Sequence, residues 1–174
     1  LDSEERLRFN DPRRFGSLHV TADPPEWHPL LSRLGPEPLG DDFTGDYLHC
    51  IARDRRVAVK NLIMDSHVVV GIGNIYATEA LYRAGIHPAR AAGRIAPQRY
   101  ERLVGCVRSI LAEAIEAGGT TLRDFSGTDG LPGYFQQTLN AYGRGGEPCF
   151  CCGRSLKEIR LGQRSTVYCG HCQR

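Results

Sequence analysis

Cys149-Phe150-Cys151-Cys152 and, sixteen residues further on, Cys169-Gly170-His171-Cys172 place two C-x-x-C pairs near the end of this chain. Two such pairs at this separation are a strong signal for a tetrahedral zinc site. Each pair forms a tight knuckle with two thiolates on one side of the metal, and the segment between them folds back to bring the other two. We therefore predict one structural Zn²⁺ bound by Cys149, Cys152, Cys169 and Cys172.

The segment between the knuckles, residues 153–168, is predicted to form a β-hairpin. Its turn is expected near residues 160–164, and Ser165-Thr166-Val167-Tyr168 has the composition of a return strand. Cys151 is a possible competing ligand, but the x-x spacing favours its neighbours. The histidines His67, His87 and His171 are poor ligand candidates, because four cysteines already complete the shell.

The hairpin region is basic. Residues 140–174 contain six basic side chains against two acidic ones, Glu147 and Glu158. A small, basic hairpin held by a metal is poorly explained by redox chemistry and well explained by contact with a phosphate backbone. The alternative is a structural zinc site without a partner. The basic residues are Arg144, Arg154, Lys157, Arg160, Arg164 and Arg174.

The composition of the whole chain sets limits. Its 174 residues can form one modest core, or two small units with a metal-bound appendage. The net charge is only +2, so an argument for nucleic acid depends on where the charges lie. Cys50, Cys106 and Cys151 are an odd remainder that favours a reducing cytosol. With no apolar run of about 18 residues and no signal peptide before Leu1, we expect a cytoplasmic protein that does not contact a membrane.

Hydrophobic periodicity predicts a mainly helical middle section with β structure at both ends. Short strands are expected before residue 21, with a turn at Asn10-Asp11-Pro12 between them. Asp41-Asp42 is expected to open the first helix, and Gly85 to end the third. The predicted strands are residues 6–9 and 15–20, and the predicted helices are residues 41–53, 57–64, 74–84 and 97–117.

An apolar run, residues 68–70, enters a Gly71-Ile72-Gly73 turn that opens directly onto the third predicted helix. A dinucleotide site is disfavoured, since it would need a small residue where Tyr76 sits and a preceding β-α-β unit. The free amides near Asn74 suit a DNA phosphate, and Lys60 could join them. The other interpretation is an ordinary interhelical turn in which Asn74 caps the helix.

Several segments, in order and across nearly the whole chain, resemble formamidopyrimidine-DNA glycosylase, a bacterial DNA-repair enzyme of 8-oxoguanine. Taken together the match is specific, and the related endonuclease VIII group fits less well at residues 13–15 and 74–77. The matching segments are Asn10-Asp11-Pro12-Arg13-Arg14-Phe15-Gly16, Leu34-Gly35-Pro36-Glu37-Pro38-Leu39, Val70-Gly71-Ile72-Gly73-Asn74-Ile75-Tyr76-Ala77, Ala84-Gly85-Ile86-His87-Pro88, Gly118-Gly119-Thr120-Thr121-Leu122, Gly133-Tyr134-Phe135 and Tyr142-Gly143-Arg144.

The resemblance implies a mainly α fold with small β parts. Residues 1–33 would be the last strands of an N-terminal β-sandwich and a linker. Residues 34–139 would be a helix–two-turns–helix domain with a lesion-recognition loop, and residues 140–174 a zinc-finger β-hairpin. The implied function is DNA binding and damage recognition in base excision repair, by a monomer acting on duplex DNA with an oxidised purine or an abasic site. The alternative is a non-catalytic, zinc-dependent nucleic-acid-binding module.

The resemblance also assigns roles to single residues. Arg13 and Phe15 match side chains that fill the space left by a flipped base, and residues 121–134 match the loop that closes over that base. Lys60, Asn74 and Arg164 would hold phosphates near the lesion. The family's nucleophile is the amine of an N-terminal proline, which has no counterpart at Leu1. We therefore expect no catalytic residue in this chain and place the nucleophile upstream of it, in the bacterial parent protein.

Overall fold

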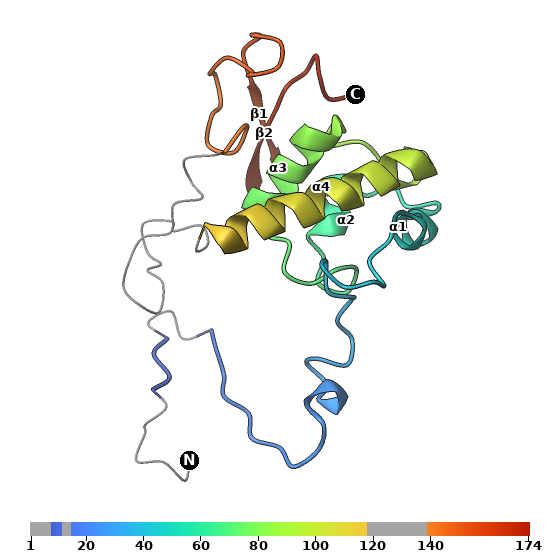
Figure 1. The fold of residues 1–174 in the computed structure, drawn as a ribbon, viewed down its shortest axis with the longest axis vertical. Helices are drawn as coiled ribbons and strands as arrows, with labels where there is room; N and C mark the ends of the chain where they lie inside the picture. The colour runs from blue at the N-terminus through green and yellow to red at the C-terminus, as the bar shows by residue number, and fades with distance from the viewer. Residues whose placement is uncertain (1–7, 12–14, 118–138) are drawn as a thin grey trace. The chain divides into compact units, whose positions relative to one another are not determined.

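A computed structural model describes residues 8–11, 15–117 and 139–174 of the chain. The chain divides into two compact units, residues 1–33 and 34–174 (Figure 1). The second unit holds all the α-helices and the only sheet of the described residues, a two-stranded one. No described helix is long and apolar enough to cross a membrane. The predicted mainly helical fold with a small β part is confirmed.

In the first unit, the only regular element described is a short 3₁₀ helix, η1 (Pro25–Trp27). None of the described residues of this first unit is buried. The predicted strand at residues 15–20 is wrong, because this segment pairs with no strand among the described residues. Alternating apolar residues form a strand only when a neighbouring strand accepts their backbone hydrogen bonds. Of the other predicted strand, residues 6–9, the first two residues lie outside the described residues, and the last two belong to no described strand.

Four α-helices form the body of the second unit. The first, α1 (Gly45–Ala52), begins four residues later than predicted, because the hydroxyl of Thr44 accepts from the backbone N–H of Tyr47 at 3.1 Å and so caps it. A short η2 (Ala92–Arg94) precedes the last helix. Pro97 begins that helix and Gly85 ends α3 in a left-handed conformation, both as predicted. The other helices are α2 (Val59–Ile63), α3 (Asn74–Ala84) and α4 (Pro97–Glu116).

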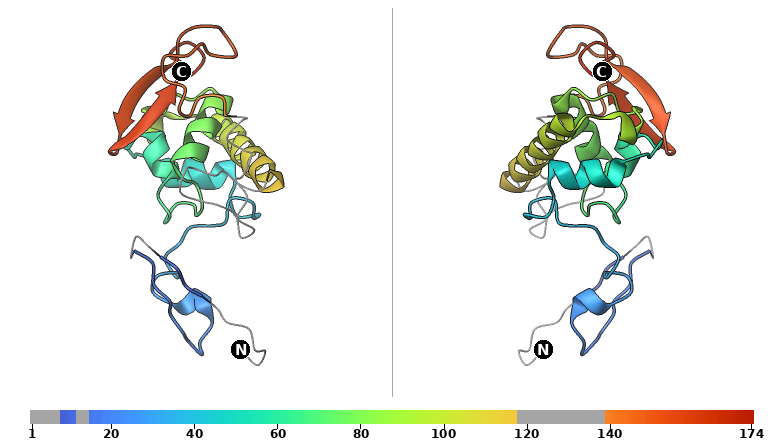
Figure 2. Two further views of the ribbon diagram at one scale, coloured as in Figure 1. Left: turned by 90° about the vertical axis from the view of Figure 1, so that its left-hand side faces the viewer. Right: turned by 90° about the vertical axis from the view of Figure 1, so that its right-hand side faces the viewer.

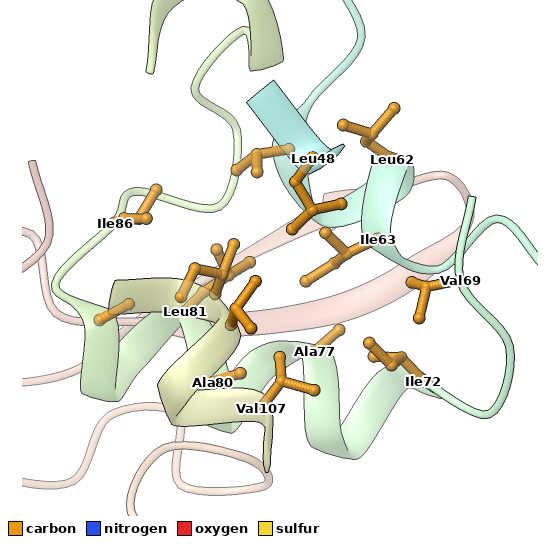
Figure 3. Packing of buried hydrophobic residues seen from close by; sticks show 14 of the residues in the cluster. Leu48, Leu62, Ile63, Val69, Ile72, Ala77, Ala80, Leu81, Ile86 and Val107 are labelled. Carbon is orange, nitrogen blue, oxygen red and sulfur yellow. The ribbon is translucent and has the colours of Figure 1, made fainter. Parts of the chain in front are cut away.

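The core forms where α3 and α1 pack against α4. Figure 3 shows Leu81 and Ala80 of α3 facing Val107 of α4, with Ile63 of α2 beside them. Gly45 lets α1 approach α4 closely, since a Cβ there would lie 2.6 Å from the backbone nitrogen of Glu101. The predicted 3.6-residue period of α4 is confirmed by its buried positions, which are Tyr100, Leu103, Val104, Val107, Ile110 and Ala114.

The predicted hairpin is confirmed. Strands β1 (Lys157–Leu161) and β2 (Arg164–Tyr168) are antiparallel, with Leu161 paired to Arg164. Gly162 and Gln163 form the two-residue turn, both with positive φ (53° and 63°), which matches the twist of the strands. The hairpin lies beside the helices of its unit, with β2 packed on α3 (Figure 2).

Glu79 of α3 anchors the segment that leads into the hairpin. Its side chain is 1% exposed, and its two carboxylate oxygens accept from four donors. Oε1 accepts from the backbone N–H groups of Ala141 and Tyr142, both at 2.8 Å. Oε2 accepts from the backbone N–H of Asn140 at 2.9 Å and from its Nδ2 at 3.2 Å. A buried carboxylate thus satisfies three consecutive backbone amides.

We expect Glu79→Gln to lower the free energy of unfolding by roughly 3 kcal/mol. The NH₂ group of the introduced glutamine would face N–H donors that the carboxylate now satisfies, and those donors would be left without an acceptor. For a chain of this size, this corresponds to a melting temperature about 6–12 °C lower. Glu113→Gln is the matched control: Glu113 binds Arg83 at 2.6 Å on a partly exposed surface, where a pair contributes at most about 1 kcal/mol. Thermal unfolding of both variants tests this, and equal losses would contradict the anchor role.

Candidate zinc centre and nucleic-acid interface

The four predicted zinc ligands come together at the base of the hairpin. The Sγ atoms of Cys149, Cys152, Cys169 and Cys172 all lie within 4.8 Å of one another. Tetrahedral coordination with Zn–S bonds of about 2.3 Å separates the sulfurs by about 3.8 Å, and the Cys152 and Cys169 sulfurs are 3.5 Å apart. The cluster therefore fits one zinc ion in a closed, structural site.

Neighbouring groups orient these sulfurs. The backbone N–H of Cys172 donates to the Cys169 sulfur at 3.4 Å, and the Tyr82 hydroxyl lies 3.1 Å from the Cys149 sulfur. Tyr82 belongs to α3, so the metal centre is also tied to the helices. Cys149 and Cys169 are buried, whereas Cys151 is exposed and outside the four-sulfur cluster. Outer contacts of this kind fix the ligand geometry of a metal site.

The N-terminus of α3 follows the Gly71-Ile72-Gly73 turn. Gly71 has a φ of 76°, and Gly73 is the N-cap residue without a side-chain hydrogen bond. The prediction that Asn74 caps this helix is wrong, because Asn74 is the first helical residue and its side chain points elsewhere: its Nδ2 donates to the Ser165 carbonyl at 3.2 Å. With no acidic side chain in its first turn, this helix end presents its positive pole and its first amides to an anion.

Lys60 is fully buried, with 0% of its surface exposed. Its Nζ donates to Asn74 Oδ1 at 2.6 Å, to Thr166 Oγ1 at 2.6 Å and to the Ser165 carbonyl at 3.2 Å. The structure thus brings Lys60 and Asn74 together, as the sequence suggested. It places the ammonium group inside the protein, however, rather than on the surface where a phosphate would bind.

Arg164 begins β2, directly after the hairpin turn, and its side chain is exposed. The turn itself contacts α2, since a Cβ on Gly162 would lie 3.2 Å from the side chain of Asn61. Arg164 directly precedes Ser165, whose carbonyl accepts from both Lys60 Nζ and Asn74 Nδ2 at 3.2 Å. Burial, together with the charge of Arg164, lowers the pKa of Lys60 to about 8. The exposed arginine, the α3 N-terminus and Asn74 therefore converge at the junction of hairpin and helices.

The remaining predicted DNA contacts belong to other parts of the chain. Phe15 is described in the first unit, where 84% of its surface is exposed, and that exposure excludes a core role for it within this unit. Arg13 and the predicted recognition loop at residues 121–134 lie outside the described residues.

A second basic surface was missed by sequence reasoning. Arg55, Arg56 and Arg94 line a cavity of about 610 Å³ together with Asp54, which has a φ of 60°. The backbone N–H of Gly93 donates to the Arg55 carbonyl at 2.9 Å and holds the two segments together. The run Arg53-Asp54-Arg55-Arg56 was the available signal. Arg94 could not be added to it, because only folding brings it to the same cavity.

The fold and metal centre define a helical domain joined to a four-cysteine zinc finger, and family models identify both parts. Residues 34–126 match the formamidopyrimidine-DNA glycosylase H2TH domain, and residues 146–174 match the zinc finger found in FPG and IleRS. The chain belongs to the formamidopyrimidine-DNA glycosylase family. The finger match and the cysteine geometry together establish one structural zinc site.

Individual relatives agree. The chain is 64% identical over 168 residues to the formamidopyrimidine-DNA glycosylase of Alkalilimnicola ehrlichii, covering 97% of this chain and 61% of the relative. It is 60% identical over 174 residues to that of Xanthomonas axonopodis pv. citri, covering 100% of this chain and 64% of the relative. The chain thus spans less than two thirds of the length of these bacterial relatives.

Solved structures give the same result. The crystal structure of the MutM (Fpg) protein of Thermus thermophilus superposes with a TM-score of 0.84 at 42% identity, over 94% of this chain and 62% of that one. The complex of Lactococcus lactis Fpg with DNA containing an abasic site superposes with a TM-score of 0.76 at 32% identity, over 83% and 53%.

Proposed function

We propose that this chain is the DNA-binding and damage-recognition part of a bacterial, cytoplasmic DNA glycosylase and abasic-site lyase. The parent protein would remove oxidised purines, such as 8-oxoguanine and formamidopyrimidines, from duplex DNA as a monomer. Family membership supports the reaction class, and a relative's complex with abasic-site DNA supports the partner. The observation that carries the proposal is the convergence of Arg164, Asn74 and the α3 N-terminus at one exposed junction.

This junction suits a DNA phosphate. The first amides of α3 donate hydrogen bonds to phosphate oxygens, and the helix dipole favours their negative charge. Arg164 adds a planar, permanently charged guanidinium that can bind two phosphate oxygens at once. Such contacts fix the position of the duplex without reading its sequence. Damage recognition then falls to the residues that replace the flipped base, which we propose to be Arg13 and Phe15.

The exposed aromatic ring of Phe15 fits this second role. An apolar ring inserted between base pairs fills the space of the extruded nucleotide and gains burial beyond what it has in this chain. Arg13 would donate hydrogen bonds to the base left without its partner. These two residues would therefore strengthen binding to DNA with a missing or extruded base more than binding to intact duplex.

Replacing Arg164 tests the phosphate contact. We expect Arg164→Ala to weaken binding to a duplex with an abasic-site analogue roughly tenfold, which is about 1.4 kcal/mol. The slope of log affinity against log salt concentration should fall by about one unit, because one fewer counterion is released. The effect should be the same for several DNA sequences. Fluorescence anisotropy at four or more salt concentrations measures both quantities.

Arg154→Ala is the matched control, since it removes the same charge from an exposed arginine next to the first knuckle, away from the hairpin turn. Its salt slope should stay close to that of the unmodified chain. If Arg164→Ala lowers the affinity but leaves the slope unchanged, Arg164 has a structural role and does not bind a phosphate.

A further inference from the structure

The ammonium group of Lys60 has all its hydrogen-bonding capacity taken up inside the protein. An ammonium group has three N–H donors, and the structure supplies three oxygen acceptors, on Asn74, Ser165 and Thr166. The side chain is fully buried, so no proton is left for a phosphate on the surface. Lys60 must therefore act through the groups that it binds.

These groups come from three separate elements. Lys60 belongs to α2, Asn74 opens α3, and the two hairpin acceptors belong to β2. The Ser165 carbonyl accepts from Lys60 and also from Asn74 Nδ2, which closes a triangle of hydrogen bonds. The hairpin is tied in this way to the helix end next to Arg164, the first residue of β2 and the residue before Ser165.

A positive charge at this position has an energetic cost. None of the three acceptors of Lys60 carries a negative charge, and the neighbouring Arg164 is a like charge that adds to the effect of burial in lowering the pKa of Lys60. A packed apolar side chain would avoid this cost. Methionine, for example, would fill the space but would hold neither Asn74 nor β2. The geometry therefore gives the lysine a function that stability alone does not supply.

We infer that Lys60 is a positioning residue, which holds Asn74 and the Arg164–Thr166 segment of β2 in register so that helix and hairpin bind the same DNA phosphate group. The inference rests on the phosphate site proposed above and deepens it. The buried Lys60 thereby sets the geometry of the exposed groups that bind the phosphate.

The proton on Lys60 links this role to pH. A neutral amine has two protons for three acceptors, so one contact is lost as pH rises through the pKa of about 8. The other charged groups beside the junction include Arg164 on β2 and two residues of β1, namely Glu158, which accepts from the Ser165 hydroxyl, and Arg160, which pairs with Ser165. The first turn of α3 has no acidic group. DNA affinity should therefore fall above about pH 8, whereas this drop should be absent in Lys60→Met.

Folding stability should change in the opposite direction. The folded pKa of Lys60 lies below its ordinary value of 10.5, so between these two values the unfolded chain binds more protons. Stability then rises with pH across this window. A falling DNA affinity together with a constant or rising melting temperature would exclude partial unfolding as its cause, because partial unfolding would lower both.

A double-mutant cycle between Lys60→Met and Asn74→Ala tests the inference in the 174-residue chain, with a duplex carrying an abasic-site analogue. We expect each single variant to bind about tenfold more weakly and the double variant to bind no more weakly than Asn74→Ala alone. Lys60→Arg should not restore affinity, because a guanidinium does not fit a buried site with contacts of 2.6 Å. Zinc content and melting temperature should be unchanged or higher in Lys60→Met. Lys157→Met, at the only other lysine, controls for the loss of one charge.

Additive effects, a salt slope lower by one unit in Lys60→Met and rescue by Lys60→Arg would together overturn the inference and assign Lys60 a direct phosphate contact, leaving the proposed function intact. If Lys60→Met does not fold, Thr166→Val against Thr166→Ser decides, since only the latter keeps the hydroxyl that Lys60 binds. Equal affinities of these two variants would overturn it. If Lys60→Met, Asn74→Ala and Arg164→Ala all bind as tightly as the unmodified chain, the phosphate site itself is wrong.

Discussion

Cys169→Ser is expected to abolish zinc binding, unfold residues 146–174 and weaken binding to abasic-site DNA at least about a hundredfold, or 2.7 kcal/mol. The buried cluster of the finger contains only Cys149, Leu156, Val167 and Cys169, so half of its residues are themselves metal ligands. A unit this small folds largely on the free energy of metal binding, about 10–16 kcal/mol in zinc-finger peptides. Losing the hairpin removes Arg164 from the proposed phosphate site and Ser165 from Asn74 together.

The helices should keep their structure in this variant. Their core is a separate and much larger cluster, so the far-ultraviolet circular dichroism of α1 to α4 should change little. Hydrogen exchange followed by mass spectrometry would show fast exchange in residues 157–168 and unchanged protection in residues 97–116. Elemental analysis should give one zinc per unmodified chain and close to none in Cys169→Ser.

Cys151→Ser provides the matched control, because Cys151 is exposed and lies between the two ligands of the first knuckle. This variant should retain one zinc and full DNA affinity. Zinc loss in Cys151→Ser together with zinc retention in Cys152→Ser would contradict the ligand set and make Cys151 the fourth ligand. Less than half an equivalent of zinc in the unmodified chain, purified without chelator, would contradict the site as a whole.

The features that could be predicted from the sequence are those whose physical cause is local. The zinc site follows from the spacing of the two cysteine pairs, because each knuckle is a turn of four residues. The buried face of α4 follows from a 3.6-residue period, and the end of α3 from Gly85, whose φ of 71° strains other residues. In each case, the deciding residues are neighbours along the chain.

The features that could not be predicted depend on residues distant in sequence. Lys60 looked like a surface cation because nothing near it indicates burial, and the Thr166 hydroxyl that binds it is 106 residues away. Asparagine is a residue type that often caps helices, but the side chain of Asn74 instead forms hydrogen bonds with Lys60 and with the Ser165 carbonyl. No local pattern around Glu79 indicates its anchoring role, because that role depends on backbone amides 61 to 63 residues further along the chain. Tertiary contacts of this kind override local preference.

The two lysines of the chain lead to the prediction with the largest expected effect. Residues 1–174 alone should form no borohydride-stable adduct with abasic-site DNA, whereas a polypeptide that carries a relative's proline-initiated N-terminal region before Leu1 should be trapped efficiently. Borohydride traps a Schiff base, which forms only when an amine is aimed at C1′ of the sugar. The amine of Lys60 is buried with all its protons engaged, so it cannot reach a sugar.

Lys157 is exposed on β1, and the family resemblance gives it no catalytic role. A denaturing gel of end-labelled abasic duplex after borohydride treatment separates trapped from free DNA. A parallel sample of chain and duplex without borohydride is the negative control. The same chain should still bind that duplex in an equilibrium assay, so a missing adduct would reflect a missing nucleophile and not a missing complex. An adduct formed by residues 1–174 would contradict the prediction. Its loss in Lys157→Met would then identify that lysine as the nucleophile, and its persistence there would point to the amine of Leu1.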